Sequence, residues 1–124
     1  MSITEDGISA EKRGRVLLKV RGWNIQQIDW IGEKNGKWVV FEIKHRELFN
    51  PPPFLGTGLD KSQIFLRGQL LSAFNLHTML IVFRKNTDEV YCQYLDVLEK
   101  GTHFDTKNKI RIYPIENFTK IKAK

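Results

Sequence analysis

The sequence has few of the features that mark secreted or membrane proteins. Its 124 residues include a single cysteine, Cys92, which cannot form a disulfide within the chain. No run approaches the roughly 18 consecutive apolar residues that a transmembrane helix needs. The first residues also lack the basic and then apolar pattern of a secretory signal. From these absences we expect a soluble, cytoplasmic protein.

The length and the composition predict one globular domain. A single domain usually has about 100 to 150 residues, and no internal repeat or low-complexity tract divides this chain. Hydrophobic residues make up 41% of the sequence and charged residues 27%, a balance typical of a chain that folds around a core. We therefore expect residues 1–124 to form a single domain.

Positive charge exceeds negative charge, most clearly near the two ends of the chain. The 20 lysines and arginines and the 14 aspartates and glutamates give a net charge of +6, and the pI is about 9.6. A basic balance indicates a nucleic-acid partner, because contacts with phosphates dominate such binding. Ordinary solvated lysines are an equal alternative. The candidate nucleic-acid contacts are Lys12, Arg13, Arg15, His45, Arg46, Lys61 and Arg67.

The first part of the chain predicts a helix followed by a hairpin. Ser9 is a typical helix cap, and apolar residues follow at helical spacing, so we expect a helix over about 10–20 that Gly22 ends. Two strands are expected over 23–31 and 38–44, because Asn35-Gly36 is a strong hairpin signal. The second strand is apolar on both faces, which predicts the centre of a sheet.

The second part predicts a long loop, a helix and further strands. Three consecutive prolines and two glycines in 48–59 indicate a loop, whose Phe49 and Phe54 either contact DNA or cover the core. Asp60 is expected to begin a helix that ends near Phe74, with a capping box formed by Gln63. Strands are expected over 78–83, 89–97 and 109–113.

Three ionisable residues fall together near the ends of the two hairpin strands. Asp29 lies near the end of one strand, and Glu42 and Lys44 lie on one face of its partner. Two carboxylates at such a point suit Mg²⁺, which usually takes one or two protein carboxylates and fills its other positions with water and phosphate. The simpler alternative is an exposed charge pair between Glu42 and Lys44. A charge in an otherwise apolar strand favours the metal site.

The sequence resembles the PD-(D/E)XK nuclease superfamily. The resemblance rests on Ile28-Asp29 and on Phe41-Glu42-Ile43-Lys44 after a hairpin, within the order helix, strand, strand, helix, strand. It covers residues 9–83, although Ile28 replaces the proline of the motif. The resemblance implies a restriction-endonuclease-like α/β fold, with three layers, a central mixed β-sheet flanked by helices and an α-β-β-β-α-β core.

The resemblance also implies roles for individual residues. Asp29 and Glu42 would hold Mg²⁺ or Mn²⁺, and Lys44 would assist catalysis. An acid on the first helix often joins this group in the superfamily, and Glu11 matches it here. Several branches place a glutamine of the second helix beside the metal, which makes Gln63 a further candidate catalytic residue.

Small basic members of the superfamily include archaeal-type and phage Holliday-junction resolvases and, as a second choice, nucleases resembling the VRR-NUC group. The implied function is a metal-dependent DNA endonuclease, selective for branched DNA, with a homodimer as a hypothesis that provides two active sites. Three alternatives stay open. They are a general nuclease, an RNA-directed or partner-directed nuclease, and a non-catalytic DNA-binding module.

Overall fold

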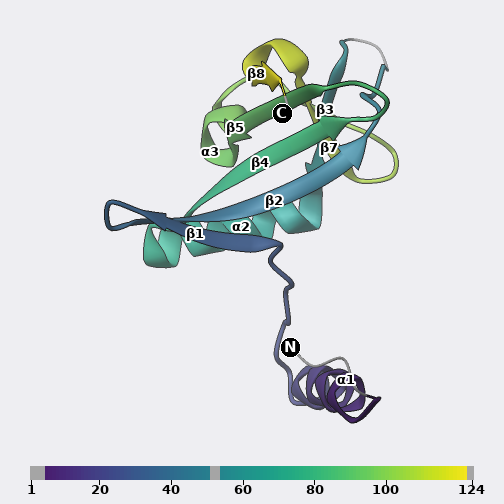
Figure 1. The fold of residues 1–124 in the computed structure, drawn as a ribbon, viewed down its shortest axis with the longest axis vertical. Helices are drawn as coiled ribbons and strands as arrows, with labels where there is room; N and C mark the ends of the chain where they lie inside the picture. Colours follow the sequence, from purple (N-terminus) through teal and green to yellow (C-terminus); the bar gives the residue numbers. More distant parts are fainter. Residues whose placement is uncertain (1–4, 51–53, 123–124) are drawn as a thin grey trace.

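A computed structural model describes residues 5–50 and 54–122 of the chain. Figure 1 shows its elements. In chain order they are α1 (Glu5–Val20), β1 (Trp30–Lys34), β2 (Lys37–Arg46), β3 (Gly56–Asp60), α2 (Lys61–Phe74), β4 (His77–Arg84), β5 (Glu89–Tyr94), α3 (Leu95–Lys100), β6 (Phe104–Asp105), β7 (Ile110–Pro114), a 3₁₀ turn (Ile115–Asn117) and β8 (Thr119–Lys122).

The strands form two sheets. A five-stranded sheet has the order β1-β2-β4-β5-β8, in which β2 and β4 are parallel and the other pairs are antiparallel. A three-stranded antiparallel sheet has the order β3-β7-β6. The mixed α/β fold class is therefore confirmed, with a central mixed sheet and the expected order α-β-β-β-α-β up to β4.

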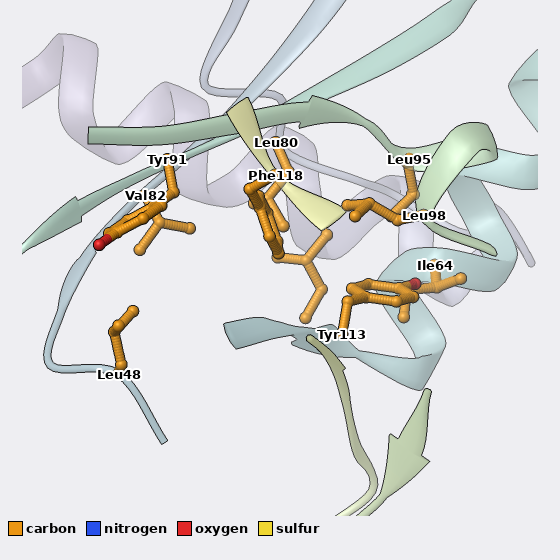
Figure 2. Close-up of a cluster of buried hydrophobic side chains, with 10 residues drawn as sticks. Leu48, Ile64, Leu80, Val82, Tyr91, Leu95, Leu98, Tyr113 and Phe118 are labelled. Carbon is orange, nitrogen blue, oxygen red and sulfur yellow. The ribbon is translucent and has the colours of Figure 1, made fainter. Parts of the chain in front are cut away.

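The hydrophobic core lies on one face of the central sheet (Figure 2). Leu80 and Val82 of β4 point to this face and are fully buried. They pack in one cluster with Ile64 of α2 and Tyr113 of β7, so α2 and the smaller sheet cover this face together. We call it the inner face.

The expected hairpin between β1 and β2 is confirmed. Asn35 and Gly36 have φ angles of 53° and 80°, and two consecutive positive values are characteristic of a type I′ turn. Strand β2 lies inside the sheet, although β4 occupies the middle position.

Several predicted boundaries were wrong. The helix α1 begins at Glu5, so Ser9 lies within it rather than at its start. Only Trp30–Lys34 forms the first strand, and residues 23–29 are not a strand. The strand predicted over 89–97 ends at Tyr94, because the chain turns there into the short helix α3.

The predicted long loop contains a strand. Gly56–Asp60 forms β3, at the edge of the smaller sheet. A Cβ atom on Gly58 would lie 1.7 Å from the Arg111 carbonyl oxygen, so this glycine is needed for β3 to lie against β7. The glycines that suggested a loop therefore permit a close strand pair. Residues 51–53, which hold the three prolines, lie outside the described residues.

The helix α2 has the predicted limits but not the predicted cap. Asp60 makes no side-chain capping bond, so the capping box with Gln63 was wrong. The Lys61 N–H group instead donates to the Lys109 carbonyl, 2.9 Å away, which satisfies one free donor of the helix start through the backbone.

The helix α1 lies apart from the rest of the protein (Figure 1). It ends at Val20, and Gly22, the residue predicted to stop it, lies in the following turn with a φ of 92°. Residues 23–29 connect it to β1 in an extended segment. Among the described residues, no helix is long and apolar enough to span a membrane.

Candidate functional site

Asp29 lies in the connecting segment, one residue before β1, and is tied to the neighbouring strand β2. Its Oδ2 atom accepts a hydrogen bond from the Ile43 N–H group at 2.8 Å. Because Ile43 follows Glu42 directly, this bond places the Asp29 carboxylate against the part of β2 that carries Glu42 and Lys44. The three motif residues are therefore brought to one place.

Glu42 points to the inner face and is almost fully buried, with 2% of its surface exposed. Its partner is Arg67 of α2, which is 3% exposed. Arg67 donates from Nε to Glu42 Oε1 at 2.8 Å and from Nη2 to the same oxygen. Nη2 also donates to the Gln27 carbonyl at 3.0 Å. One guanidinium thus joins β2, α2 and the segment before β1.

The direction of α2 over β2 shows which other side chains share this region. Arg67 of α2 contacts Glu42 of β2. Burial lowers the pKa of Arg46, the last residue of β2, and the nearby negative charge of Asp60 opposes this shift. Asp60 therefore lies near the end of β2, and α2 runs antiparallel to β2. One helical turn and two strand residues cover similar lengths. Gln63, one turn before Arg67, lies on the same side of α2 as Arg67.

Gln63 has an unused acceptor. Its Oε1 atom is buried and accepts no hydrogen bond from the residues that the structure describes. An unpaired buried acceptor costs free energy, so such an atom is a place where a ligand or a water molecule is expected. Lys44 is half-buried on the neighbouring strand. Lys44 thus provides an ammonium group, and Gln63 provides an amide oxygen that has no donor among the described residues.

The residues predicted on the first helix do not join this group. Glu11 is exposed on α1, which lies apart from β2. Lys12, Arg13 and Arg15 are exposed on the same helix. The third carboxylate expected from the resemblance is therefore distant from Asp29 and Glu42 within one chain.

The other predicted nucleic-acid contacts have varied surroundings. His45 is exposed on the outer side of β2, and Arg46 is half-buried with its guanidinium 5.6 Å from the centre of the Phe49 ring. Lys61 forms an ion pair with Asp105 at 3.3 Å. Arg67 is enclosed by its contacts to Glu42 and Gln27, so its surroundings are those of an internal ion pair.

The donor set for a divalent cation consists of two carboxylates. Among the described residues, no group of three or more histidine, cysteine or acidic side chains could hold a metal ion. Mg²⁺ is commonly held by one or two carboxylates together with substrate phosphates, so Asp29 and Glu42 meet its minimum. Both bonds that Arg67 makes to Glu42 go to the Oε1 atom. The residues therefore fit a cation that shares Glu42 with Arg67.

The chain resembles known proteins in structure and not in sequence. No family model and no curated protein matches the sequence. A solved structure does: that of Hjc, a Holliday junction resolvase from the archaeal hyperthermophile Archaeoglobus fulgidus, at 1.6 Å resolution. The match covers 83% of this chain and 84% of that chain, with 12% identity and a TM-score of 0.45. The chain is similar to an archaeal resolvase.

Sequence reasoning did not identify Arg67 as the partner of Glu42. A signal was present, because Ile64, Arg67 and Leu71 recur at helical spacing on one face of α2. An arginine within such a stripe points to the interior, where it needs an acidic partner. Gln27, which contributes its backbone carbonyl, left no signal in the sequence.

Proposed function

We propose that the chain is a metal-dependent nuclease that cuts DNA and selects branched substrates. The observation that carries this proposal is the bond between Asp29 and Ile43, because it brings Asp29 beside Glu42 and Lys44. The net charge of +6 supports a phosphate-rich substrate. The branched-DNA part rests on the resemblance of the sequence to small resolvases.

Asp29 and Glu42 are the residues that would hold Mg²⁺ or Mn²⁺. Such an ion, when bound, lowers the pKa of a coordinated water and neutralises charge on a phosphate. The protein's own contribution is rigidity. Asp29 is oriented by the backbone of β2, and Glu42 is held by Arg67, so neither carboxylate has to be ordered when substrate arrives.

Lys44 and Gln63 would act on the substrate side of the two carboxylates. The Lys44 ammonium stabilises negative charge on the scissile phosphate or orients the attacking water. The Gln63 Oε1 atom, free of protein donors in the described residues, accepts a hydrogen bond from that water. Glu42 and Arg67, which are bonded to each other, are close in sequence to Lys44 and Gln63 respectively, and this supports a shared role.

In this proposal Arg67 is a positioning residue. Its guanidinium is enclosed, so it acts through Glu42 and not through a phosphate. Lys12, Arg13, Arg15, His45 and Arg46 remain the proposed DNA contacts, together with Lys61 if it leaves Asp105.

The test is cleavage of a labelled four-way junction, a linear duplex of the same sequence and a single strand, each with Mg²⁺ or with EDTA. The parent protein is expected to cut the junction in Mg²⁺ only. Glu42→Gln is expected to slow cutting at least about 1,000-fold, because it removes a charged ligand. The matched control is Asp88→Asn, an equivalent change at an exposed turn residue, which should cut at the parent rate.

Other outcomes would change the proposal. Equal cutting of junction and duplex would replace the resolvase by a general nuclease. Tight binding without cutting in any divalent metal would favour the non-catalytic module. The bond between Arg67 and Glu42 supports this non-catalytic alternative, because the arginine already neutralises the Glu42 carboxylate.

A further inference from the structure

Two apolar surfaces of this chain face solvent, and they lie on separate parts of the structure. The first is a stripe along α1. Val16, Leu17 and Val20 fall on one side of the helix and are 60%, 55% and 79% exposed. A surface helix normally buries such a stripe against a core. In Figure 1 the helix lies away from the sheets, so its apolar side has no partner among residues 5–50 and 54–122.

The second surface is the face of the central sheet opposite α2, which we call the outer face. Side chains alternate along a strand, and Glu42 points to Arg67 of α2. Its neighbours Phe41 and Ile43 therefore point to the outer face. Their partners across the sheet extend this apolar surface through Trp30, Met79 and Ile81.

The outer face is uncovered and hollowed. Trp30 is 66% exposed, and no helix among the described residues packs over this face. A depression of about 460 Å³ is lined by Gly32, Val39, Phe41 and Tyr94. A Cβ atom at Gly32 would lie 3.0 Å from the Phe41 ring, so the glycine helps to keep this hollow open. An apolar side chain of a helix fits such a hollow.

The path of the connecting segment restrains α1 from covering the outer face of its own chain. Gln27 and Asp29 are bonded to Arg67 and Ile43, which anchors the end of the segment. Asn24, Gln26 and Ile28 line a pocket together with residues of α2, on the inner side. Residues 21–26 span at most about 20 Å. For α1 to reach the outer face of its own chain, these six residues would have to pass around β1, the edge strand of the central sheet.

We propose that two copies of this chain exchange their α1 helices, so that the Val16, Leu17 and Val20 stripe of each copy covers the outer face of the other. A second copy presents this face without the restraint of the connecting segment. The 16 residues of α1 form a helix about 24 Å long and about 10 Å wide. If the two exchanged helices lie along this face over their whole length, they bury on the order of 1,000 Å² in total, the size at which specific interfaces begin. The argument for the exchange does not rest on the proposed nuclease activity.

The native cysteine offers a direct test. Cys92 is opposite Ile81 in the sheet register and lies on the outer face. Val16→Cys, Leu17→Cys and Val20→Cys are made one at a time and oxidised at alkaline pH, because burial raises the pKa of the Cys92 thiol. The expected result is a disulfide-linked dimer on a non-reducing gel. Arg15→Cys, on the other side of α1, is the matched control and should cross-link at least about 10-fold less.

The outcomes separate a second copy from the same chain. Peptide mapping of the dimer should find the new cysteine bonded to Cys92. A monomer with an internal disulfide to Cys92 would mean that α1 folds back, which overturns the exchange. Failure of all three positions to cross-link, together with a monomeric sedimentation coefficient, would overturn it as well.

Sedimentation equilibrium provides a second measurement without cysteine. Leu17→Gln with Val20→Gln is expected to raise the dimer dissociation constant at least about 100-fold, because each dimer loses four buried apolar side chains. The control, Arg15→Gln with Lys19→Gln, should leave it unchanged within about 3-fold. All four positions are exposed on α1, so the sheets should retain their far-ultraviolet spectrum. Equal dissociation constants for the two double variants would overturn the proposal.

Discussion

Glu42 on β2 and Glu89 on β5 are both bonded to arginines of neighbouring elements, and their surroundings differ. Glu42 is 2% exposed and is bonded to Arg67, which is equally enclosed. Glu89 lies at the rim of the sheet and has three partners. Arg84 donates to it at 3.0 Å, Tyr91 at 2.9 Å and Lys120 at 2.7 Å.

The difference teaches what each carboxylate can do. At Glu89, two cations, Arg84 and Lys120, and the Tyr91 hydroxyl share the charge, so the loss of one partner leaves the others in place. At Glu42 the charge has one ionic partner among the described residues, and the loss of that partner leaves a buried charge without compensation. The rim cluster resembles ordinary surface electrostatics. The pair of Glu42 and Arg67 is a specific arrangement on which a site can be built.

The largest expected effect is from Arg67→Ala. It should lower the free energy of unfolding by about 3–5 kcal/mol, because the Glu42 charge remains buried without its partner. Urea unfolding followed by tryptophan fluorescence measures this change. A loss below about 1 kcal/mol would mean that water reaches Glu42 and that the two sites differ little.

The double variant Glu42→Leu with Arg67→Met sharpens the same comparison. It removes both charges and fills the space with apolar atoms, so the free energy of unfolding should be within about 1 kcal/mol of the parent value, or above it. DNA cleavage should nevertheless be lost. This combination would separate the contribution of the pair to stability from its contribution to chemistry. A strongly destabilised double variant would contradict this expectation.

A smaller effect is expected at Glu89 and appears only in acid. The hydrogen bonds from Lys120, Tyr91 and Arg84 lower the pKa of Glu89 from 4.5 to about 2. Because the pKa is depressed in the folded state, the stabilisation is fully present above about pH 4.5 and is lost as the pH falls towards about 2. Glu89→Gln should therefore flatten the dependence of the melting temperature on pH in this window. Asp88→Asn, at the adjacent turn, should retain the parent profile.

The smallest effect is expected from Arg84→Ala. Arg84 also bonds Glu47 at 2.7 Å, but both side chains reach solvent, and Glu89 keeps Lys120 and Tyr91. The urea midpoint should change little and should depend on salt, because exposed charges are screened. Measurements at low and high salt would test this. A loss as large as that of Arg67→Ala would remove the contrast between the two clusters.

Local chemistry made much of the fold predictable. Asn35 and Gly36 predicted the turn because few residues adopt two consecutive positive φ angles without strain. Gly22 predicted the end of α1 for a similar reason. The limits of α2 and the strands β2, β4 and β7 also follow from apolar patterns and turn residues. These features depend on residues close together in sequence.

The errors arose where a distant segment supplied what the local sequence lacked. The backbone of Lys109 caps α2 in place of the predicted capping box. The strand β7 makes a strand of the glycine-rich segment Gly56–Asp60. In each case a backbone group from the C-terminal part of the chain provides the hydrogen-bond partner. The local sequence does not show that this distant segment will lie there.

For the site, the sequence by itself determined the chemical types. It placed Asp29, Glu42 and Lys44 at the spacing of paired strands, with Glu42 in an apolar segment. Only the tertiary structure decided that Asp29 bonds the backbone of β2, that Arg67 neutralises Glu42, and that Glu11 lies far from both. The physical reason is the distance along the chain over which each feature is determined. Side-chain type and strand alternation are local properties, whereas the partner of a buried charge depends on which helix covers the sheet.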